Sequence, residues 1–353
     1  MAERRTTIVG TGLIGGSVGL ALSEQGWTVS GVDTDAECLA AARDLGAIAA
    51  EGWDPAAAIT FVATPVRSIP DAVRSALART EGVVTDVGSV KESVVAQVDD
   101  PRFVGGHPMA GSEQDGIAGA SASLFSGSVW VMTPGPSTSD EAFTLARRVA
   151  VDLGAEVIAL EPARHDGLVA MVSHVPHLTA ATLMRLADER ATEHAAMLRL
   201  AAGGFRDMTR IAAGRPSIWP DICDQNRAAI TEVIDQLIAS LSEVRSLVGE
   251  QRSEELLTVL EDARRARLNL PSRIVQPETV TEVRVPVSDR SGELARITTL
   301  AAELDVSIAD LEILHSAEGQ QGVVILLVER DLAERFRGGL IALGYRPSLR
   351  DLQ

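Results

Sequence analysis

Residues 7–15 read TIVGTGLIG, a β-branched run that passes directly into three glycines with the spacing G-x-G-x-x-G. A strand that ends in such a turn and opens a helix is typical of a dinucleotide-binding unit. Gly10 would permit the tight turn, Gly12 would let a pyrophosphate approach the backbone, and Gly15 would allow close helix–strand packing. The N-terminus of the helix would then face the phosphate charge. We therefore predict a Rossmann-type unit at the start of the chain.

Asp33 follows the next β-rich run at about the distance that this pattern expects of an acidic residue. Its carboxylate can accept hydrogen bonds from two ribose hydroxyls and would repel a 2′-phosphate, and neither Thr34 nor Asp35 offers that phosphate a cation. The sequence thus predicts NAD rather than NADP. The expected cofactor-binding residues are Gly10, Gly12, Leu13, Ile14, Gly15, Asp33 and Thr64. The alternative is a purely structural glycine turn, with Asp33 serving as an ordinary helix cap.

Up to about residue 160, short β-rich runs alternate with helix-like stretches such as 16–24 and 36–45. This alternation indicates βαβ units and a mostly parallel sheet. The β-rich runs are residues 7–9, 28–32, 59–63, 83–86, 128–132 and 156–158.

After Pro162 the apolar period becomes helical, and no strand-like run occurs before Asn269. The apolar residues between 230 and 241 cover a broad helix face, which could pack in a helical core or against another subunit. Beyond it, residues 280–350 read as a small βαββαβ unit with a turn at Glu318-Gly319. We predict an α/β Rossmann domain (1–163), an all-α dimerisation domain (164–270), a linker (271–279) and a small α+β domain (280–353).

Composition limits the classes of function. With 353 residues and a formal net charge of −17, the chain is large enough for several cores and unsuited to nucleic acid or an anionic membrane. Cys38 and Cys223 fit no metal or redox spacing, so we expect two reduced thiols and no metal site. No signal segment is recognised and no apolar run approaches a membrane span, which predicts a cytoplasmic protein.

A second informative stretch is GGHPMAGSE at 105–113, which places His107 among glycines in what we expect to be a polar loop. An earlier strand ends in TDVGSVK at 85–91, which contains Ser89 and the only lysine, Lys91. In a doubly wound sheet such strand ends meet at the ligand crevice. A histidine held there beside a hydride acceptor predicts proton abstraction coupled to hydride transfer.

Two further motifs follow in order, SHVPHL at 173–178 and GGFRDMTRIA at 203–212, with WPDI at 219–222 after them. With these motifs the chain resembles the prephenate/arogenate dehydrogenases of tyrosine biosynthesis over residues 6 to 269. The C-terminal unit is similar to a ferredoxin-like ACT domain. The resemblance implies NAD-dependent oxidative decarboxylation by a homodimer, with feedback by tyrosine or phenylalanine.

The resemblance also implies roles for individual residues. His107 would accept a hydrogen bond from the ring hydroxyl, and Ser89 would hold the histidine and that hydroxyl in register. Arg210 would bind a substrate carboxylate. Residues expected around the substrate are Glu113, His177, Asp207, Arg210 and Trp219, whereas His174 is expected to be structural. In the ACT-like unit, Asp289, Ser291 and Gly292 would contact an amino-acid effector, although Val306-Ser307-Ile308 departs from the usual asparagine there. The alternative is an ACT fold that serves only for dimer contacts.

Three alternatives remain beside prephenate oxidation. Arogenate dehydrogenase would use the same chemistry on an amino-bearing side chain. β-Hydroxyacid dehydrogenases of the 6-phosphogluconate type share the layout but need a lysine in the helical domain, and no lysine follows Lys91. A non-catalytic amino-acid sensor that keeps NAD for structure is the third.

Overall fold

The computed structural model describes residues 4–112, 114, 116–191, 201, 203–269, 280–288, 290, 292–315 and 321–351. These residues form two compact units. The first contains Met1–Leu198 and Met208–Gly249, and the second contains Arg199–Asp207 and Glu250–Gln353.

The first unit contains an eight-stranded sheet in the order β3-β2-β1-β4-β5-β6-β7-β8. Neighbouring strands are parallel except for β6 and β7, which pair antiparallel. The six predicted runs all form strands, and the order of the first six strands is the doubly wound order of a Rossmann domain. The strands are β1 Arg5–Val9, β2 Thr28–Val32, β3 Ala50–Glu51, β4 Ile59–Val62, β5 Val83–Asp86, β6 Phe103–Pro108, β7 Val129–Thr133 and β8 Glu156–Ala159.

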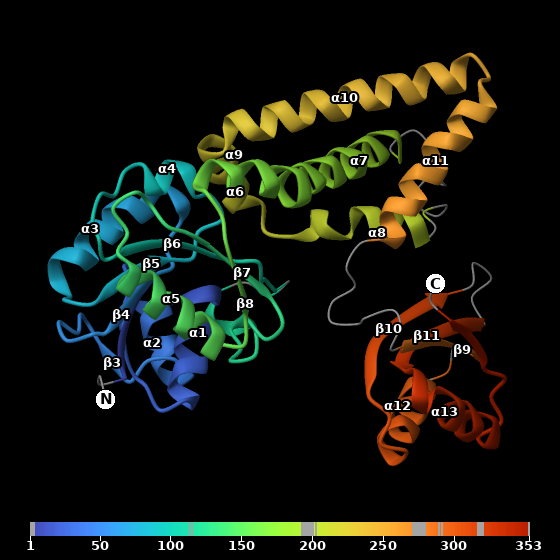
Figure 1. The fold of residues 1–353 in the computed structure, drawn as a ribbon, viewed down its shortest axis with the longest axis horizontal. Helices are drawn as coiled ribbons and strands as arrows, with labels where there is room; N and C mark the ends of the chain where they lie inside the picture. The colour runs from blue at the N-terminus through green and yellow to red at the C-terminus, as the bar shows by residue number, and fades with distance from the viewer. Residues whose placement is uncertain are drawn as a thin grey trace. The chain divides into compact units, whose positions relative to one another are not determined.

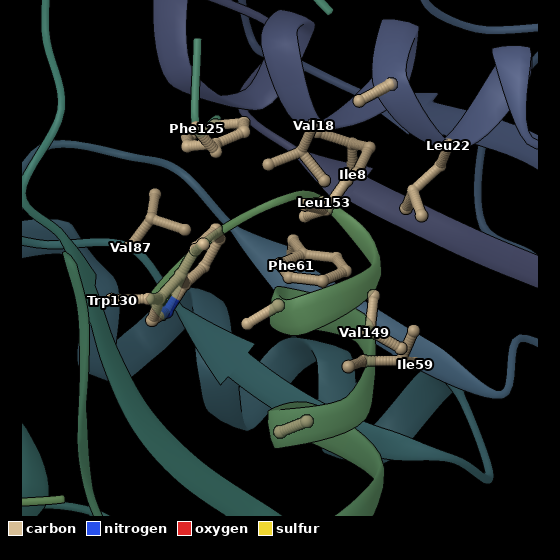
Figure 2. Packing of buried hydrophobic residues seen from close by; sticks show 14 of the residues in the cluster. Ile8, Val18, Leu22, Ile59, Phe61, Val87, Phe125, Trp130, Val149 and Leu153 are labelled. Atoms are coloured by element: carbon tan, nitrogen blue, oxygen red, sulfur yellow. The ribbon is translucent and has the colours of Figure 1, made fainter. Parts of the chain in front are cut away.

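Helices cover both faces of this sheet. Successive residues of one strand are therefore buried in different cores. Ile8 and Phe61 pack with α1 and α5 (Figure 2), whereas Val9 and Val62 pack with α3 and α4. Phe61 meets the buried ring of Trp130 edge-on, with 6.2 Å between ring centroids. The helices of this part are α1 Leu13–Glu24, α2 Ala36–Asp44, α3 Ile69–Arg79, α4 Glu92–Val95 and α5 Asp140–Asp152.

The helical zone of the first unit follows the sheet, and Figure 1 shows its long helices side by side. Ala170, Val175, Ile230 and Val233 form its buried core, while Ile238 and Leu241 on the same apolar series are exposed in the single chain. The elements are α6 Pro162–Val169, a π-helical turn Ala170–His174, α7 Val175–Ala191, α9 Trp219–Gln225 and α10 Arg227–Gly249.

Contrary to the expectation that no apolar run approaches a membrane span, one helical run does so. The continuous helical run Pro162–Glu189 is long and apolar enough, by length and composition, to cross a membrane. It also carries the buried side chains of His165, Asp166 and His174, each hydrogen-bonded within the protein. Length and composition are therefore weak evidence for a membrane span here, because such polar groups are costly on a lipid-facing helix.

The second unit ends in a four-stranded antiparallel sheet of order β10-β11-β9-β12. Its βαββαβ order agrees with the prediction. The assignment of this unit as an ACT domain stays a prediction. The predicted turn at Glu318-Gly319 and the linker lie outside the described residues. Val283, Ile297, Leu326 and Phe336 are at the centre of its core. The elements are α11 Ser253–Leu268, β9 Val280–Ser288, α12 Glu293–Glu303, β10 Ile308–His315, β11 Gln321–Glu329, α13 Arg330–Ala342 and β12 Ser348–Asp351, and α8 Gly203–Thr209 contains the boundary between the units.

Candidate active site

The glycine loop lies where the carboxyl ends of β1 and β4 meet, at the point where the strand order reverses. Gly10 has φ of 90°, and a Cβ there would lie 2.5 Å from the carbonyl oxygen of Ala63. A Cβ on Gly15 would lie 1.9 Å from the carbonyl oxygen of Gly10. A larger residue at either position would therefore clash with the protein backbone itself, so these two glycines need no ligand to explain them.

Gly12 is different, because a Cβ there would meet no atom of the described residues within 4 Å. It stands at the N-cap of α1, where no side chain in the described part of the chain caps the helix, and Leu13 and Ile14 begin that helix. Thr64 lies next to Gly10, and its buried hydroxyl oxygen has no hydrogen-bond partner among the described residues. Open space at the helix N-terminus, together with this hydroxyl near the glycine loop, fits a bound phosphate group.

Asp33 follows β2 directly and is half-buried. Its carboxylate accepts hydrogen bonds from the backbone N–H groups of Thr11 (2.7 Å) and Asp35 (3.0 Å). The cap of α2 is Asp35, which accepts from the N–H groups of Glu37 and Cys38. Asp33 is thus not the helix cap, and its fixed carboxylate is suited to accept hydrogen bonds from ribose hydroxyls.

His107 does not lie in a loop, contrary to expectation: it belongs to β6, between the parallel neighbour β5 and the antiparallel neighbour β7. Glycine pairs are poor strand formers, which is why the sequence suggested a loop. Here the packing requires them, because a Cβ on Gly106 would lie 2.6 Å from the carbonyl oxygen of Asp86. The strand therefore carries His107 to the carboxyl edge of the parallel sheet.

A chain of hydrogen bonds connects His107 to two residues that the sequence analysis missed. His107 Nδ1 lies 2.8 Å from His165 Nε2, and His165 Nδ1 lies 2.7 Å from Asp166 Oδ1. The Asp166 carboxylate also accepts from the backbone N–H groups of Lys91 (2.8 Å) and Glu92 (2.9 Å). The side chains of His165 and Asp166 are almost fully buried. Their only sequence signal was an adjacent His–Asp pair at the start of the helical zone.

Lys91 is fully buried and forms an ion pair with Asp86, which is also fully buried. The Lys91 ammonium donates to the carbonyl oxygen of Gly106 (2.9 Å), and Asp86 Oδ1 accepts from the Gly106 N–H (3.1 Å). Burial lowers the pKa of Lys91, and the neighbouring carboxylates oppose that shift. The pair binds both polar backbone groups of Gly106 and so fixes the residue before His107.

The electrostatic surroundings favour a neutral His107. Burial holds the pKa of His107 well below its usual range, and the positive charge of Lys91 lowers it further. Because a neutral imidazole keeps one nitrogen lone pair, His107 can accept a hydrogen bond from a substrate hydroxyl at neutral pH.

The remaining candidates are not all brought together. His177 stacks on Trp219, with ring centroids 3.8 Å apart, and the buried His174 Nδ1 lies 3.2 Å from Asn226 Nδ2. Ser89 is half-buried two residues before Lys91, and Arg210 is exposed after α8. Asp207 lies in the second unit. Gly292 directly precedes α12 and has a φ of 94°. The other three candidates, Glu113, Asp289 and Ser291, lie outside the described residues.

His174 leads to a prediction for acid stability. Burial lowers its pKa to about 4 in the folded protein, whereas the unfolded chain binds this proton near the ordinary value of about 6.5. Between these values the unfolded state binds more protons, so the free energy of unfolding should fall as the pH falls from about 6.5 to 4. The loss should be on the order of 3 kcal/mol. Urea unfolding across this range should show a shallower fall in His174→Asn, and an equal slope in both proteins would contradict the assignment.

Comparison with known proteins identifies the family of the chain. The chain matches the family model described as "Prephenate dehydrogenase, nucleotide-binding domain" over residues 18–159 and the one described as "Prephenate dehydrogenase, dimerization domain" over 161–262. It is 32% identical to prephenate dehydrogenase of Bacillus subtilis strain 168, over 94% of each chain.

Two solved structures are also similar. Prephenate dehydrogenase from Aquifex aeolicus in complex with hydroxyphenyl propionate and NAD+ is 30% identical, with a TM-score of 0.72 over 77% of this chain and 99% of that one. Synechocystis arogenate dehydrogenase is 29% identical, with a TM-score of 0.65 over 74% and 98%. The chain is therefore an oxidoreductase that belongs to the prephenate dehydrogenase family.

Proposed function

We propose that the protein catalyses NAD-dependent oxidative decarboxylation of prephenate to 4-hydroxyphenylpyruvate in the cytoplasm. The family and the name of the Bacillus relative support prephenate as the substrate, and the Aquifex complex supports both NAD and a hydroxyphenyl ligand at such a site. The observation that carries the proposal is the partly buried, neutral imidazole of His107 at the carboxyl edge of the sheet.

The chemistry balances with one base. NAD, when bound, supplies the acceptor for the hydride that leaves ring carbon C4. His107 accepts the proton of the C4 hydroxyl, whose oxygen becomes a carbonyl before the ring aromatises. The bond from the ring to its carboxylate breaks, the carboxylate departs as carbon dioxide, and its bonding electrons complete the aromatic ring. The C4 oxygen takes up a proton in return, which His107 can give back, and becomes the phenol hydroxyl of the product. Since aromatisation makes this step downhill, the protein needs to supply mainly positioning and proton removal.

The cofactor site consists of Gly10, Gly12, Gly15, Asp33 and Thr64, together with Leu13 and Ile14. Open space at Gly12 and the unpaired Thr64 hydroxyl support phosphate binding, and the Asp33 carboxylate supports NAD over NADP. We also assign Ser89 to orient the substrate hydroxyl, and Glu113, His177, Asp207 and Trp219 to the surroundings of the substrate. The face-to-face stack of His177 on Trp219 supports a wall of the pocket at that place.

Arg210 is assigned to a substrate carboxylate, because a guanidinium can bind a carboxylate through two parallel hydrogen bonds. Arg210→Ala should raise KM for prephenate about 10- to 100-fold, the equivalent of one charged hydrogen-bonded pair. Arg215→Ala is the matched control, since Arg215 is also exposed and bonds to Ser217. An unchanged KM in Arg210→Ala would remove this role.

Arogenate oxidation is the second candidate, supported by the similarity to the Synechocystis arogenate dehydrogenase. The two substrates differ only in the side chain, as keto or amino group. NADH absorbance should be followed with the purified full chain, NAD, and prephenate or arogenate in parallel. Faster turnover of prephenate is expected. Faster turnover of arogenate would make arogenate the preferred substrate. Formation of no NADH with either compound would favour the non-catalytic sensor.

We propose the domain division 1–163, 164–270, 271–279 and 280–353, with a homodimer formed through the helical domain. The match to a dimerization domain and the exposed Ile238 and Leu241 support that surface. The C-terminal domain is assigned as an ACT domain that binds tyrosine or phenylalanine near Asp289, Ser291 and Gly292.

A cavity of about 340 Å³ supports effector binding in the C-terminal domain. Glu293 and Arg296 line it, together with Tyr345, whose hydroxyl donates to Glu293 (2.6 Å). A carboxylate and a guanidinium in one cavity suit the two charges of a free amino acid. Calorimetry on the full chain should detect tyrosine binding together with a loss of activity, whereas full activity and no heat in saturating tyrosine would contradict the assignment.

A further inference from the structure

We propose that His165 and Asp166 are positioning residues that fix the tautomer of His107, so that its Nε2 carries the lone pair offered to the substrate hydroxyl. The proposal rests on the proposed function, in which His107 is the base. His165 and Asp166 belong to α6, whereas His107 belongs to β6, so the arrangement exists only in the folded protein.

The direction of each hydrogen bond follows from the Asp166 carboxylate. An ionised carboxylate can only accept, so the proton between Asp166 Oδ1 and His165 Nδ1 (2.7 Å) belongs to the histidine. The carboxylate itself is held in place by the backbone N–H groups of Lys91 and Glu92, at 2.8 and 2.9 Å. It has no freedom to turn away from His165.

A neutral His165 that is protonated at Nδ1 has its lone pair on Nε2. That atom lies 2.8 Å from His107 Nδ1 and therefore accepts a hydrogen bond from it. His107 is then protonated at Nδ1, and its own lone pair is on Nε2. The fixed carboxylate of Asp166 thus sets which nitrogen is protonated in His165 and, through the next hydrogen bond, which nitrogen is protonated in His107.

The burial of the dyad favours a positioning role over a direct one. The side chain of His165 is fully buried and that of Asp166 is 2% exposed, whereas His107 is only partly buried. A substrate could therefore reach His107 but not the two residues behind it. Asn226 also donates to the backbone carbonyl of Asp166 (2.9 Å), which fixes the backbone of the dyad as well as its side chains.

The test compares two substitutions of similar length. His165→Leu removes the acceptor for His107 Nδ1–H, and both His107 tautomers become accessible. We expect kcat to fall about 10- to 100-fold, the loss seen when the partner of a metal-bound histidine is removed, with KM changed less than about 3-fold. His165→Gln keeps an acceptor, because its side-chain oxygen can face His107 Nδ1, and should recover most of the lost kcat.

Nitrogen-15 chemical shifts of histidine provide a readout that a merely structural role would not move. In the wild-type full chain, His107 should show a protonated Nδ1 and an unprotonated Nε2. His165→Gln should keep this pattern, and His165→Leu should mix or reverse it. Wild-type kcat in His165→Leu together with an unchanged His107 pattern would overturn the proposal.

The outcome is separable from the proposed function. If His107→Asn retains full turnover, the base assignment fails whatever the nitrogen shifts show. If His107→Asn is inactive while His165→Leu is fully active with its tautomer pattern intact, only the role of the dyad fails.

Discussion

Replacement of His107 by asparagine is expected to lower kcat by about 10²–10⁴-fold, the usual contribution of a general base. Asparagine keeps a polar group on β6 but has no lone pair of comparable basicity to take up the hydroxyl proton. Prephenate turnover, measured as NADH absorbance under saturating conditions, tests this directly.

The control for this variant is NAD binding, which should be unchanged because the glycine loop and Asp33 follow other strands, β1 and β2. It can be followed by the fluorescence of the four tryptophans. Near-normal turnover would remove the base, whereas loss of NAD binding as well would indicate damage to the whole sheet edge.

Replacement of Lys91 by methionine is expected to lower the free energy of unfolding of the first unit by about 3–5 kcal/mol. The substitution keeps the length of the side chain but leaves the fully buried Asp86 carboxylate without its counter-charge. The backbone N–H groups of Gly88 (2.9 Å) and Gly106 (3.1 Å) would still bind that carboxylate, which keeps the loss within this range.

Urea unfolding monitored by tryptophan fluorescence is suited to this measurement, because all four tryptophans lie in the first unit. Arg74→Met is the matched control. Its ion pair with Asp71 is exposed and should contribute less than about 1 kcal/mol. Equal losses in the two variants would show that burial does not set the strength of the Lys91–Asp86 pair.

The sequence predicted the elements that depend on local patterns. Each β-branched run up to residue 158 forms a strand, and the glycine loop follows β1 as predicted. His174 is buried and hydrogen-bonded, in agreement with its predicted structural place. The strand β6 was missed, because Gly105 and Gly106 have no intrinsic tendency to form one and become a strand only between β5 and β7.

The amino-acid sequence by itself thus determined the parallel sheet, the helical zone, the βαββαβ unit and the choice of His107 as the candidate base. Only the tertiary structure decided what holds that base. His107 and His165 are 58 positions apart, and the carboxylate that orients His165 is fixed by the backbone N–H groups of Lys91 and Glu92, from yet another segment. These hydrogen bonds require donor and acceptor atoms from distant segments to lie about 3 Å apart, and no local pattern of residues encodes such distances.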